Sequence, residues 1–88
     1  MVDITPTAEE IAQHFSAMDD SVTLINATVA DDSDALAQFG TAAEVKIMVT
    51  RNTDHLEIQA TKDWYSDSSK SKTPYTNAVT AGKAYVAG

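Results

Sequence analysis

The sequence lacks the cysteines that could cross-link a small protein and the signal peptide that would direct it to secretion. It contains no cysteine among its 88 residues, which excludes disulfide bonds, thiolate metal ligands and a cysteine nucleophile. The first ten residues, MVDITPTAEE, lack the basic region and apolar core of a signal peptide. No apolar run approaches the roughly 20 residues that span a bilayer. We therefore expect a soluble, cytoplasmic protein that is neither secreted nor bound to a membrane.

Recognisable catalytic motifs are also missing. The three glycines, at positions 40, 82 and 88, belong to no phosphate-binding loop or nucleophile elbow. The residues four positions after His14 and His55 are a methionine and a glutamine, so neither histidine starts a helical metal-binding pair. These observations predict a protein that is not an enzyme and has no metal or cofactor. A small catalytic or ligand-binding site around Asp54, His55 and Trp64 is the remaining enzymatic alternative.

The acidic segment at 31–34, Asp-Asp-Ser-Asp, has some likeness to a calcium-binding loop. An EF-hand loop that began at Asp31 would need glycine at its sixth position and glutamate at its twelfth. Leu36 and Ala42 stand there instead. We predict a turn, followed by a short helix over 33–39 that Asp32 or Ser33 caps and Gly40 ends. Leu36 and Phe39 would then close one end of the core.

The length of the chain predicts one helical domain over residues 1–88. A protein of this size buries only about 60–65% of the surface that its unfolded chain exposes. Small proteins without disulfides or metals often gain stability by association. We therefore expect a homo-oligomer, with a dimer as the simplest case, or a complex with another protein.

Charge is distributed unevenly along the sequence. The net charge is −7, and residues 1–45 carry nine acidic residues with no lysine or arginine, whereas residues 46–88 carry all six basic residues and four acidic ones. The two halves either present solvated faces or complement each other, within one chain or across a homodimer. The basic residues form no cluster, so direct binding to nucleic acid is not expected.

Residues 7–30 show the clearest periodicity. Thr7 and Glu10 have the spacing of a capping box, and apolar residues then recur with alternating steps of four and three, which is typical of a helix in a bundle. That stripe comprises Ile11, Phe15, Met18, Val22, Ile25 and Val29. A break near 19–21 is the main alternative to one continuous helix. We also expect Ile4 to pack beneath the start of this helix.

The longest stretch without glycine or proline, residues 42–65, fits a helix with two apolar faces. Thr41 and Glu44 have capping-box spacing, and Gly40 suits the end of the preceding turn. One broad face comprises Val45, Met48, Val49, Asn52, Leu56, Ala60 and Trp64, and a narrower second face comprises Ile47, Ile58 and Tyr65. Such a helix would lie at the centre of the fold, covered from two sides.

A β-hairpin with strands over 45–50 and 55–61 is the alternative for this stretch. Its β-branched residues favour strands, and apolar and polar residues alternate in both segments. The intervening residues 51–54, Arg-Asn-Thr-Asp, lack the Asn-Gly or Asp-Gly pair of a tight hairpin turn. The helix is therefore the favoured interpretation, and the hairpin would give an α+β fold.

After a polar loop over 66–72, the last helix is predicted over 74–86. Pro74 suits a first helical position. Tyr75, Ala78, Val79, Gly82 and Val86 would share one face. The predicted fold is all-α, a small antiparallel bundle of three main helices (about 7–30, 42–65 and 74–86) with a short helix near 33–39.

Five residues of the central stretch are candidates for an interaction site. Asn52 and Gln59 fall on its apolar face, where a buried hydrogen bond would fix the packing of the helices. Trp64 and Tyr65 end the stretch beside the polar loop and would either anchor a partner or plug the core. The fifth candidate, His55, lies between Asn52 and Gln59 in the sequence.

The second half of the sequence resembles a group of viral proteins. The residues that carry the likeness are Arg51-Asn52-Thr53-Asp54-His55-Leu56-Glu57-Ile58, then Lys62-Asp63-Trp64-Tyr65, then Tyr75-Thr76-Asn77-Ala78-Val79 and Gly82-Lys83-Ala84-Tyr85-Val86. They are similar to short uncharacterised proteins of marine tailed phages that infect cyanobacteria, over about residues 44–87. The resemblance includes no catalytic signature. It implies a phage protein located in the virion or in the cytoplasm of the host cell.

Two functions remain in view at this point. The first is a non-enzymatic, acidic helical protein that acts through protein–protein contacts or self-association, in a structural or assembly role in a phage. The second is a small regulatory protein that uses its acidic first half to mimic nucleic acid or to modulate its binding.

Overall fold

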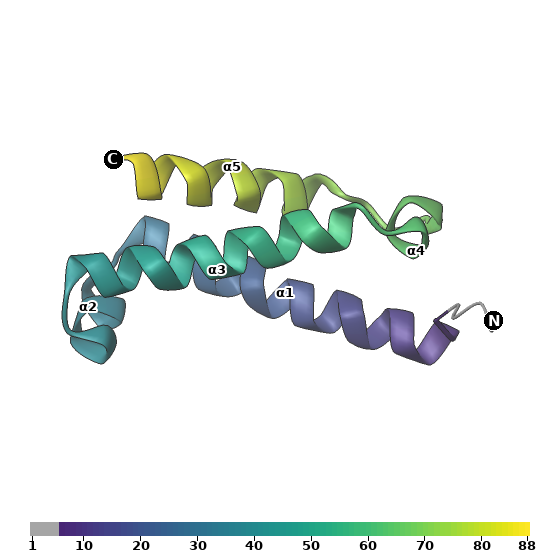
Figure 1. Cartoon of the computed structure of the whole chain (residues 1–88), viewed down its shortest axis with the longest axis horizontal. Helices are drawn as coiled ribbons and strands as arrows, with labels where there is room; N and C mark the ends of the chain where they lie inside the picture. Colours follow the sequence, from purple (N-terminus) through teal and green to yellow (C-terminus); the bar gives the residue numbers. More distant parts are fainter. Residues whose placement is uncertain (1–5) are drawn as a thin grey trace.

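The chain folds entirely into helices over the part that the structure, a computed structural model, describes, which is residues 6–88 (Figure 1). Within these residues five helices follow one another: α1 (Ala8–Ala30), α2 (Ser33–Phe39), α3 (Ala42–Ala60), α4 (Asp63–Asp67) and α5 (Thr73–Ala87). The predicted all-α fold is confirmed. The hairpin alternative is wrong, because α3 runs through both of its proposed strands. The prediction for Ile4 lies outside the described residues.

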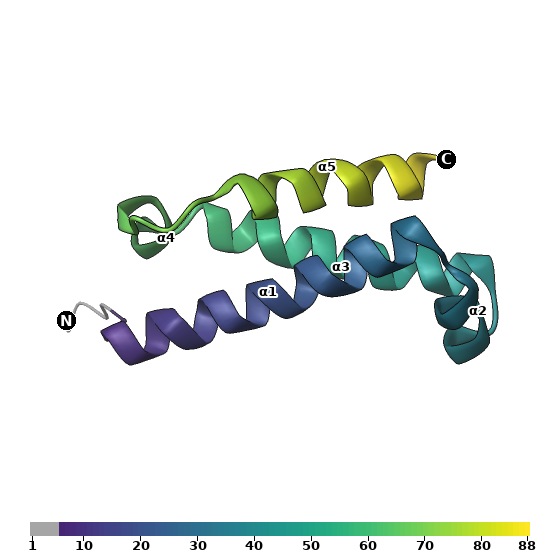
Figure 2. The same cartoon turned by 180° about the vertical axis from the view of Figure 1, so that it is seen from behind.

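Three long helices make up the body of the fold. α1, α3 and α5 each contact the other two, and the chain reverses direction from α1 to α3 and again from α3 to α5 (Figures 1 and 2). α2 makes the turn at one end, and α4 makes the turn at the other. The connections are short, which is the usual route to antiparallel neighbours in helical bundles.

α1 begins at the predicted capping box. The Thr7 hydroxyl accepts the backbone N–H of Glu10 at 3.1 Å, and the Glu10 carboxylate accepts the backbone N–H of Thr7 at 2.9 Å. The helix continues without a break through 19–21. Phe15, Met18 and Ile25 are buried, but Ser21 and Thr28 occupy the remaining buried positions, and Val29 is 41% exposed. α1 is thus rotated toward its small polar residues, which allow a neighbouring helix to approach closely.

α3 begins as predicted but ends earlier. The Thr41 hydroxyl accepts the backbone N–H of Glu44 at 3.2 Å, which is one half of the expected capping box. At the other end, the Thr61 hydroxyl donates to the Ile58 carbonyl at 2.7 Å, and Lys62 adopts an extended conformation. The prediction of one helix over 42–65 is therefore wrong at its end. Trp64 and Tyr65 belong to α4, which takes the first residues of the predicted 66–72 loop.

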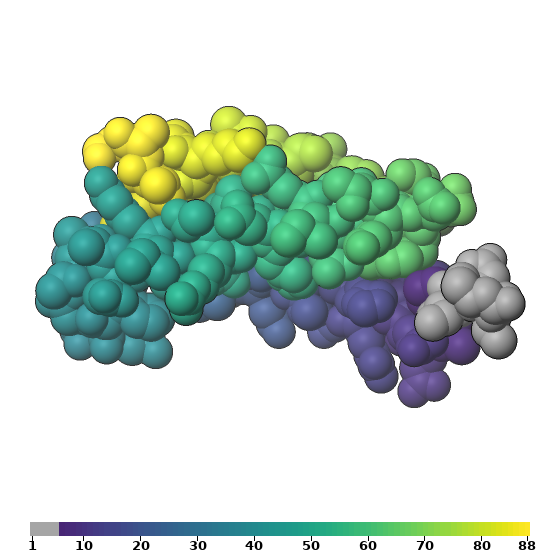
Figure 3. All heavy atoms as spheres, viewed as in Figure 1, coloured from purple at the N-terminus to yellow at the C-terminus, as the bar shows by residue number. Residues whose placement is uncertain are grey.

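The prediction of two apolar faces on the central helix is wrong for the narrower face. Val45, Val49 and Leu56 of the broad face are fully buried, whereas Ile47 and Ile58 are 43% and 55% exposed. α3 is covered by α1 and by α5, but these two helices lie on adjacent sides of it. The opposite side, which carries both isoleucines, is open (Figure 3).

The short helix and the last helix begin and end close to the predicted positions. α2 ends at Gly40, whose φ of 92° favours glycine. The predicted side-chain cap from Asp32 or Ser33 is wrong: Asp32 is at the N-cap position but makes no capping bond. The Asp31 carboxylate instead accepts the backbone N–H and the hydroxyl of Ser33. The expectation that Leu36 and Phe39 close the core is wrong, because α2 contains no buried residue. α5 starts with Pro74 in its first turn.

α3 and α5 are in close contact at Gly82. A Cβ atom at this position would collide with the Thr53 hydroxyl oxygen and would lie 3.5 Å from a methyl group of Ile25. Thr53 is itself buried, and its hydroxyl donates to the Val49 carbonyl at 2.8 Å. Gly82 is therefore required by packing, although glycine disfavours a helix interior by about 1 kcal/mol relative to alanine.

We predict that Gly82→Ala lowers the free energy of unfolding by about 1–3 kcal/mol, because the collision outweighs the gain in helix propensity. Thr53→Ala removes the obstructing hydroxyl, so the double variant should be more stable than the sum of the two single effects implies. Urea unfolding followed by circular dichroism would measure all three. Simple additivity, or a stabilising Gly82→Ala, would contradict the proposed contact.

Candidate functional site

The five candidate residues do not form one surface. Asn52 and His55 lie between α1 and α3, where both contact Ser21. Trp64 and Tyr65 belong to an aromatic cluster at the end of the bundle that contains α4. Gln59 is half-buried on α3 and takes no part in the hydrogen bonds around Ser21. Four of the five candidate residues, all except Gln59, thus contact a residue of another helix.

Ser21 is the buried hydroxyl that connects α1 to α3. The hydroxyls of Thr28 and Thr53 each donate to a carbonyl four residues earlier in their own helix, as threonines in helices often do. The Ser21 hydroxyl instead donates to Asn52 Oδ1 at 2.9 Å and lies 2.9 Å from His55 Nδ1. Ser21 is only 4% exposed, so these contacts satisfy a polar group that water does not reach.

The donor and the acceptor of each hydrogen bond around Ser21 can be assigned. A serine hydroxyl has a single proton, and that proton is used on Asn52 Oδ1. His55 must therefore donate from Nδ1 to Ser21 Oγ, which both the neutral Nδ1–H tautomer and the imidazolium can do. Asn52 Nδ2 in turn donates to the Met48 carbonyl at 2.9 Å. This series of hydrogen bonds runs from His55 through Ser21 and Asn52 to the backbone of α3. It orients the three side chains, but it does not activate Ser21 as a nucleophile, because the Ser21 proton is donated to Asn52 and not to His55.

The aromatic cluster joins α1, α4 and α5. Its members are His14, Phe15, Trp64, Tyr65 and Tyr75. The His14 and Trp64 rings are stacked, with centroids 4.9 Å apart and planes 14° apart, and the Trp64 ring meets Phe15 edge-on at 5.3 Å. Phe15, Tyr65 and Tyr75 are buried. The positions of Trp64 and Tyr65 therefore fit a plug of the core better than an exposed anchor for a partner.

Two lysines of the loop between α4 and α5 cover this cluster. Lys70 Nζ lies 5.5 Å from the centroid of the Phe15 ring, and Lys72 Nζ lies 5.3 Å from that of Tyr65. Lys72 also donates to the carbonyls of Ser68 and Lys70, at 2.7 and 2.8 Å. Cations over ring faces are attracted by the ring quadrupole, so the loop is held against the cluster.

Two tyrosines of α5 bond to aspartates of the acidic first half. The Tyr75 hydroxyl donates to Asp19 at 2.6 Å, and the Tyr85 hydroxyl donates to Asp32 at 3.1 Å. Burial raises the pKa of the Tyr75 hydroxyl above its ordinary value, and the hydrogen bond to Asp19 and its negative charge raise that pKa further. The same causes, with Asp32, raise the pKa of Tyr85.

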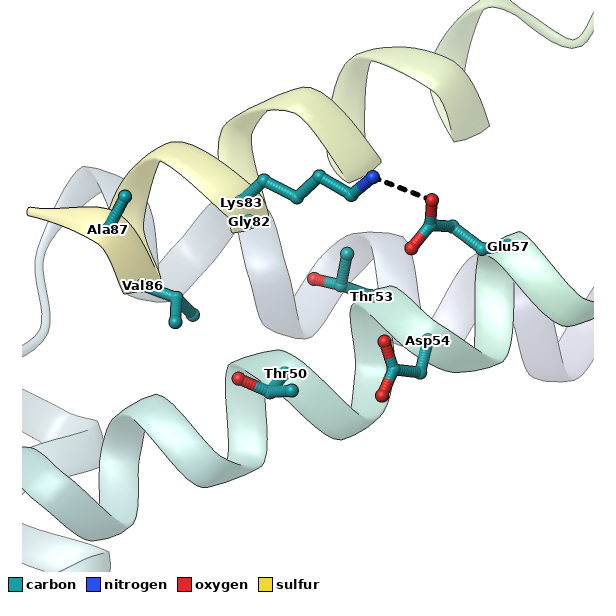
Figure 4. Close-up of a pocket in the computed structure, with 8 residues that line it drawn as sticks. All are labelled: Thr50, Thr53, Asp54, Glu57, Gly82, Lys83, Val86 and Ala87. Atoms are coloured by element: carbon teal, nitrogen blue, oxygen red, sulfur yellow. Dashed lines mark ion pairs between the residues drawn. The ribbon is translucent and has the colours of Figure 1, made fainter.

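A groove of about 200 Å³ lies between α3 and α5 (Figure 4). Glu57 of α3 and Lys83 of α5 form an ion pair of 2.7 Å at one end, and Val86 and Ala87 line the other. Asp54 also borders the groove. Asp54 therefore lies on the α5 side of α3, whereas His55 faces Ser21 on the α1 side. The catalytic alternative of Asp54, His55 and Trp64 has no common site here.

A second hollow, of about 260 Å³, lies between α1, α2 and α3. Its apolar lining includes Leu24, Phe39 and Met48, and Asp31 and Asp34 stand among the other residues that line it. Leu24 is 47% exposed and Phe39 is 39% exposed. Ile47 and Ile58 on α3 are exposed as well, at 43% and 55%.

Sequence analysis missed Ser21, His14 and Tyr75 as partners of the candidate residues. Ser21 had a usable signal, because it follows Met18 by three residues and precedes Ile25 by four, which places it on the same helical face. His14 and Tyr75 had none, since ring stacking and a tyrosine–aspartate bond across 56 positions depend on the tertiary fold.

Comparisons with protein-family models, curated proteins and solved structures found no match to this chain. Between residues 6 and 88, no three histidine or acidic side chains come together in a way that could hold a metal ion. No helix within the same range is long and apolar enough to cross a membrane.

We predict that Ser21→Ala lowers the free energy of unfolding by about 1–3 kcal/mol, because it leaves Asn52 Oδ1 and His55 Nδ1 without their partner. Ser16→Ala is the matched control, since Ser16 is exposed on the same helix and alanine there only improves helix propensity. Urea midpoints would separate the two variants. Equal midpoints would show that the contacts of Ser21 contribute nothing to stability.

The raised pKa of Tyr75 predicts a loss of stability in alkali. The unfolded chain ionises this tyrosine near pH 10, whereas the folded chain holds the proton. The stabilisation from this group is therefore complete below about pH 10 and is lost as the pH rises toward the folded pKa. Tyr75→Phe should lose about 1 kcal/mol at pH 7 through the missing hydrogen bond.

The free energy of unfolding of Tyr75→Phe should decline less steeply above about pH 10 than that of the parent. Unfolding midpoints between pH 7 and about pH 11 would measure this decline. Asp19→Asn keeps the burial of Tyr75 but removes the negative charge, so its decline should be intermediate. An unchanged slope in Tyr75→Phe would contradict the assignment.

Proposed function

We propose that this protein is a small, non-enzymatic helical protein that acts through protein–protein contacts and associates with itself, most simply as a dimer. The observation that carries this proposal is the apolar surface around α3. Ile47, Ile58, Leu24 and Phe39 are between 39% and 55% exposed, on α3 itself and in the hollow beside it. Single exposed apolar residues are common, but neighbouring groups of them mark interaction surfaces.

The biological setting that we propose is a tailed phage, in a structural or assembly role in the virion or in the host cytoplasm. Its support is the resemblance of residues 44–87 to short proteins of marine phages. A structural or assembly role works through contacts between proteins, and exposed apolar helix surface is suited to such contacts.

Four of the nine acidic residues in the first half accept hydrogen bonds from within the chain, which favours this function over mimicry of nucleic acid. Glu10 and Asp31 cap helices, and Asp19 and Asp32 accept bonds from tyrosines of α5. Acids that are held in this way serve the packing of one chain. A nucleic-acid mimic would instead need them arranged along a free surface.

Sedimentation of the full chain over a concentration series tests self-association. We expect the average mass to rise from 9.4 kDa toward about twice that value between roughly 10 µM and 1 mM, the range of weak protein complexes. A mass that stays monomeric at all concentrations, together with failure to capture any protein partner, would contradict the proposed function.

A further inference from the structure

α2 is a helix without a buried residue. Its apolar residues include Ala35, Leu36 and Phe39, but the first two are only half-buried and Phe39 is 39% exposed. The helix lies at one end of the bundle, where it contacts α1 and α3 (Figures 1 and 2). Helices in folded proteins are stabilised mainly by packing of their apolar side. That side of α2 is incompletely covered within one chain.

The incompletely covered side of α2 forms one wall of the hollow of about 260 Å³ between α1, α2 and α3. Leu24 of α1, Phe39 of α2 and Met48 of α3 supply the large apolar side chains of its lining. Aromatic residues and methionine are enriched where proteins bind one another. A cavity of about 150 Å³ accepts a benzene molecule, so this hollow has room for one large apolar side chain. It is smaller than the roughly 300–1,000 Å³ of most small-molecule sites.

The charged groups around the hollow are negative. Asp31 and Asp34 belong to its lining and are exposed, and within residues 6–88 neither has an ion-pair partner. The lining residues in that range include no lysine or arginine, and α1 and α2 contain none. The hydroxyl and the backbone N–H of Ser33 hold the pKa of Asp31 below its ordinary value, so this carboxylate stays ionised at neutral pH.

The end of α1 adds to the negative potential. The hollow lies beside the last turn of this helix, where Ala27 and Thr28 line it. Carbonyl groups at the C-terminal end of a helix carry partial negative charge and favour a cation nearby, but α1 has no basic residue in its last turn. A cationic partner would therefore be attracted both by the two carboxylates and by the end of α1.

We propose that this hollow binds a basic segment of a partner protein. A large apolar side chain of that segment enters between Leu24, Phe39 and Met48, and its lysines or arginines pair with Asp31 and Asp34. The proposal rests on the function through protein–protein contacts proposed above, and it specifies the chemistry of one partner. The same hollow on a second copy is not that partner, because two such surfaces would place like charges against each other.

An amphipathic helix is a form of segment that suits this site. Basic residues three or four positions from an apolar anchor lie on the same side of a helix, so one face can supply both the anchor and the positive charges. The hollow receives one anchor, and ion pairs with exposed carboxylates contribute little each. We therefore expect weak, reversible binding, with dissociation constants of roughly 10 µM to 1 mM.

Three synthetic peptides test the proposal on the full chain. The first is a helical peptide of about 15 residues, with one phenylalanine and with arginines three and four positions to either side of it. The second has glutamates in place of the arginines, and the third has alanine in place of the phenylalanine. Fluorescence anisotropy of dye-labelled peptide, with protein added up to about 1 mM, measures binding. The first peptide should bind, and the other two should each bind at least about 10-fold more weakly.

A pair of charge variants locates the site. Asp34→Lys and Glu9→Lys change the net charge equally, and each replaces the second residue of its helix. α1 begins at the end of the bundle opposite to α2 (Figure 2). Asp34→Lys should weaken binding of the first peptide by roughly 10-fold, and Glu9→Lys by less than about twofold.

A second pair of variants tests the apolar wall. Phe39→Ser and Ile58→Ser each remove an exposed apolar side chain, and of these two residues only Phe39 lines the hollow. Phe39→Ser should weaken binding of the first peptide by about 10-fold or more, and Ile58→Ser by less than about twofold. Circular dichroism spectra that match the parent would establish that all four variants are folded.

The outcomes separate this proposal from the function on which it rests. No binding of the first peptide, equal binding of all three peptides, or equal losses within either pair of variants overturns the basic-partner site. If no peptide binds and Phe39→Ser abolishes self-association in sedimentation, a second copy occupies the hollow, and the proposed function stands without this partner. Selective binding of the first peptide, lost in Asp34→Lys and Phe39→Ser but not in their controls, would establish the site.

Discussion

The rotation of α3 about its own axis depends on two contacts that lie on adjacent sides of the helix. On one side, Thr53 fills the space that Gly82 leaves on α5. On the other, Asn52 and His55 bond to Ser21 of α1. Because these two contacts are both made, the third side of α3 has to face outward. The exposure of Ile47 and Ile58 is thus a consequence of polar and small residues elsewhere in the chain.

The ends of most helices could be predicted from sequence because local chemistry determines them. A threonine before a glutamate, a proline in a first turn and a glycine with positive φ act within four residues of themselves. Thr7, Pro74 and Gly40 all do so here. The end of α3 has no such signal. Thr61 and Lys62 are neither glycine nor proline, and the chain turns there so that Trp64 can reach Phe15 and His14.

The buried faces were harder to predict than the helices themselves. A stripe of apolar residues predicts that a helix has an inner side, but its neighbours determine where the centre of that side lies. In α1 the centre moves from Val22 and Val29 to Ser21 and Thr28, because small side chains allow closer approach. The candidate residues Asn52 and His55 were found from their position on α3. Their shared partner, Ser21, could be placed on the buried face of α1 from its spacing to Met18 and Ile25, but its hydrogen bonds to α3 depend on how the two helices pack.

The distribution of charge over the fold bears on how a protein with a net charge of −7 could bind its own copy. Much of the acidic first half lies on α1 and α2, and α1 is nearest the viewer when the molecule is seen from behind (Figure 2). The open side of α3, which carries the exposed Ile47 and Ile58, is on the opposite side (Figure 3). Two copies that met through this open side would therefore keep their acidic sides away from each other. At physiological ionic strength the screening length is about 8 Å, so repulsion across the thickness of the bundle is weak compared with charge pairs in contact. An acidic protein of this kind can remain repelled from its copies on most of its surface while binding them through one neutral helix face.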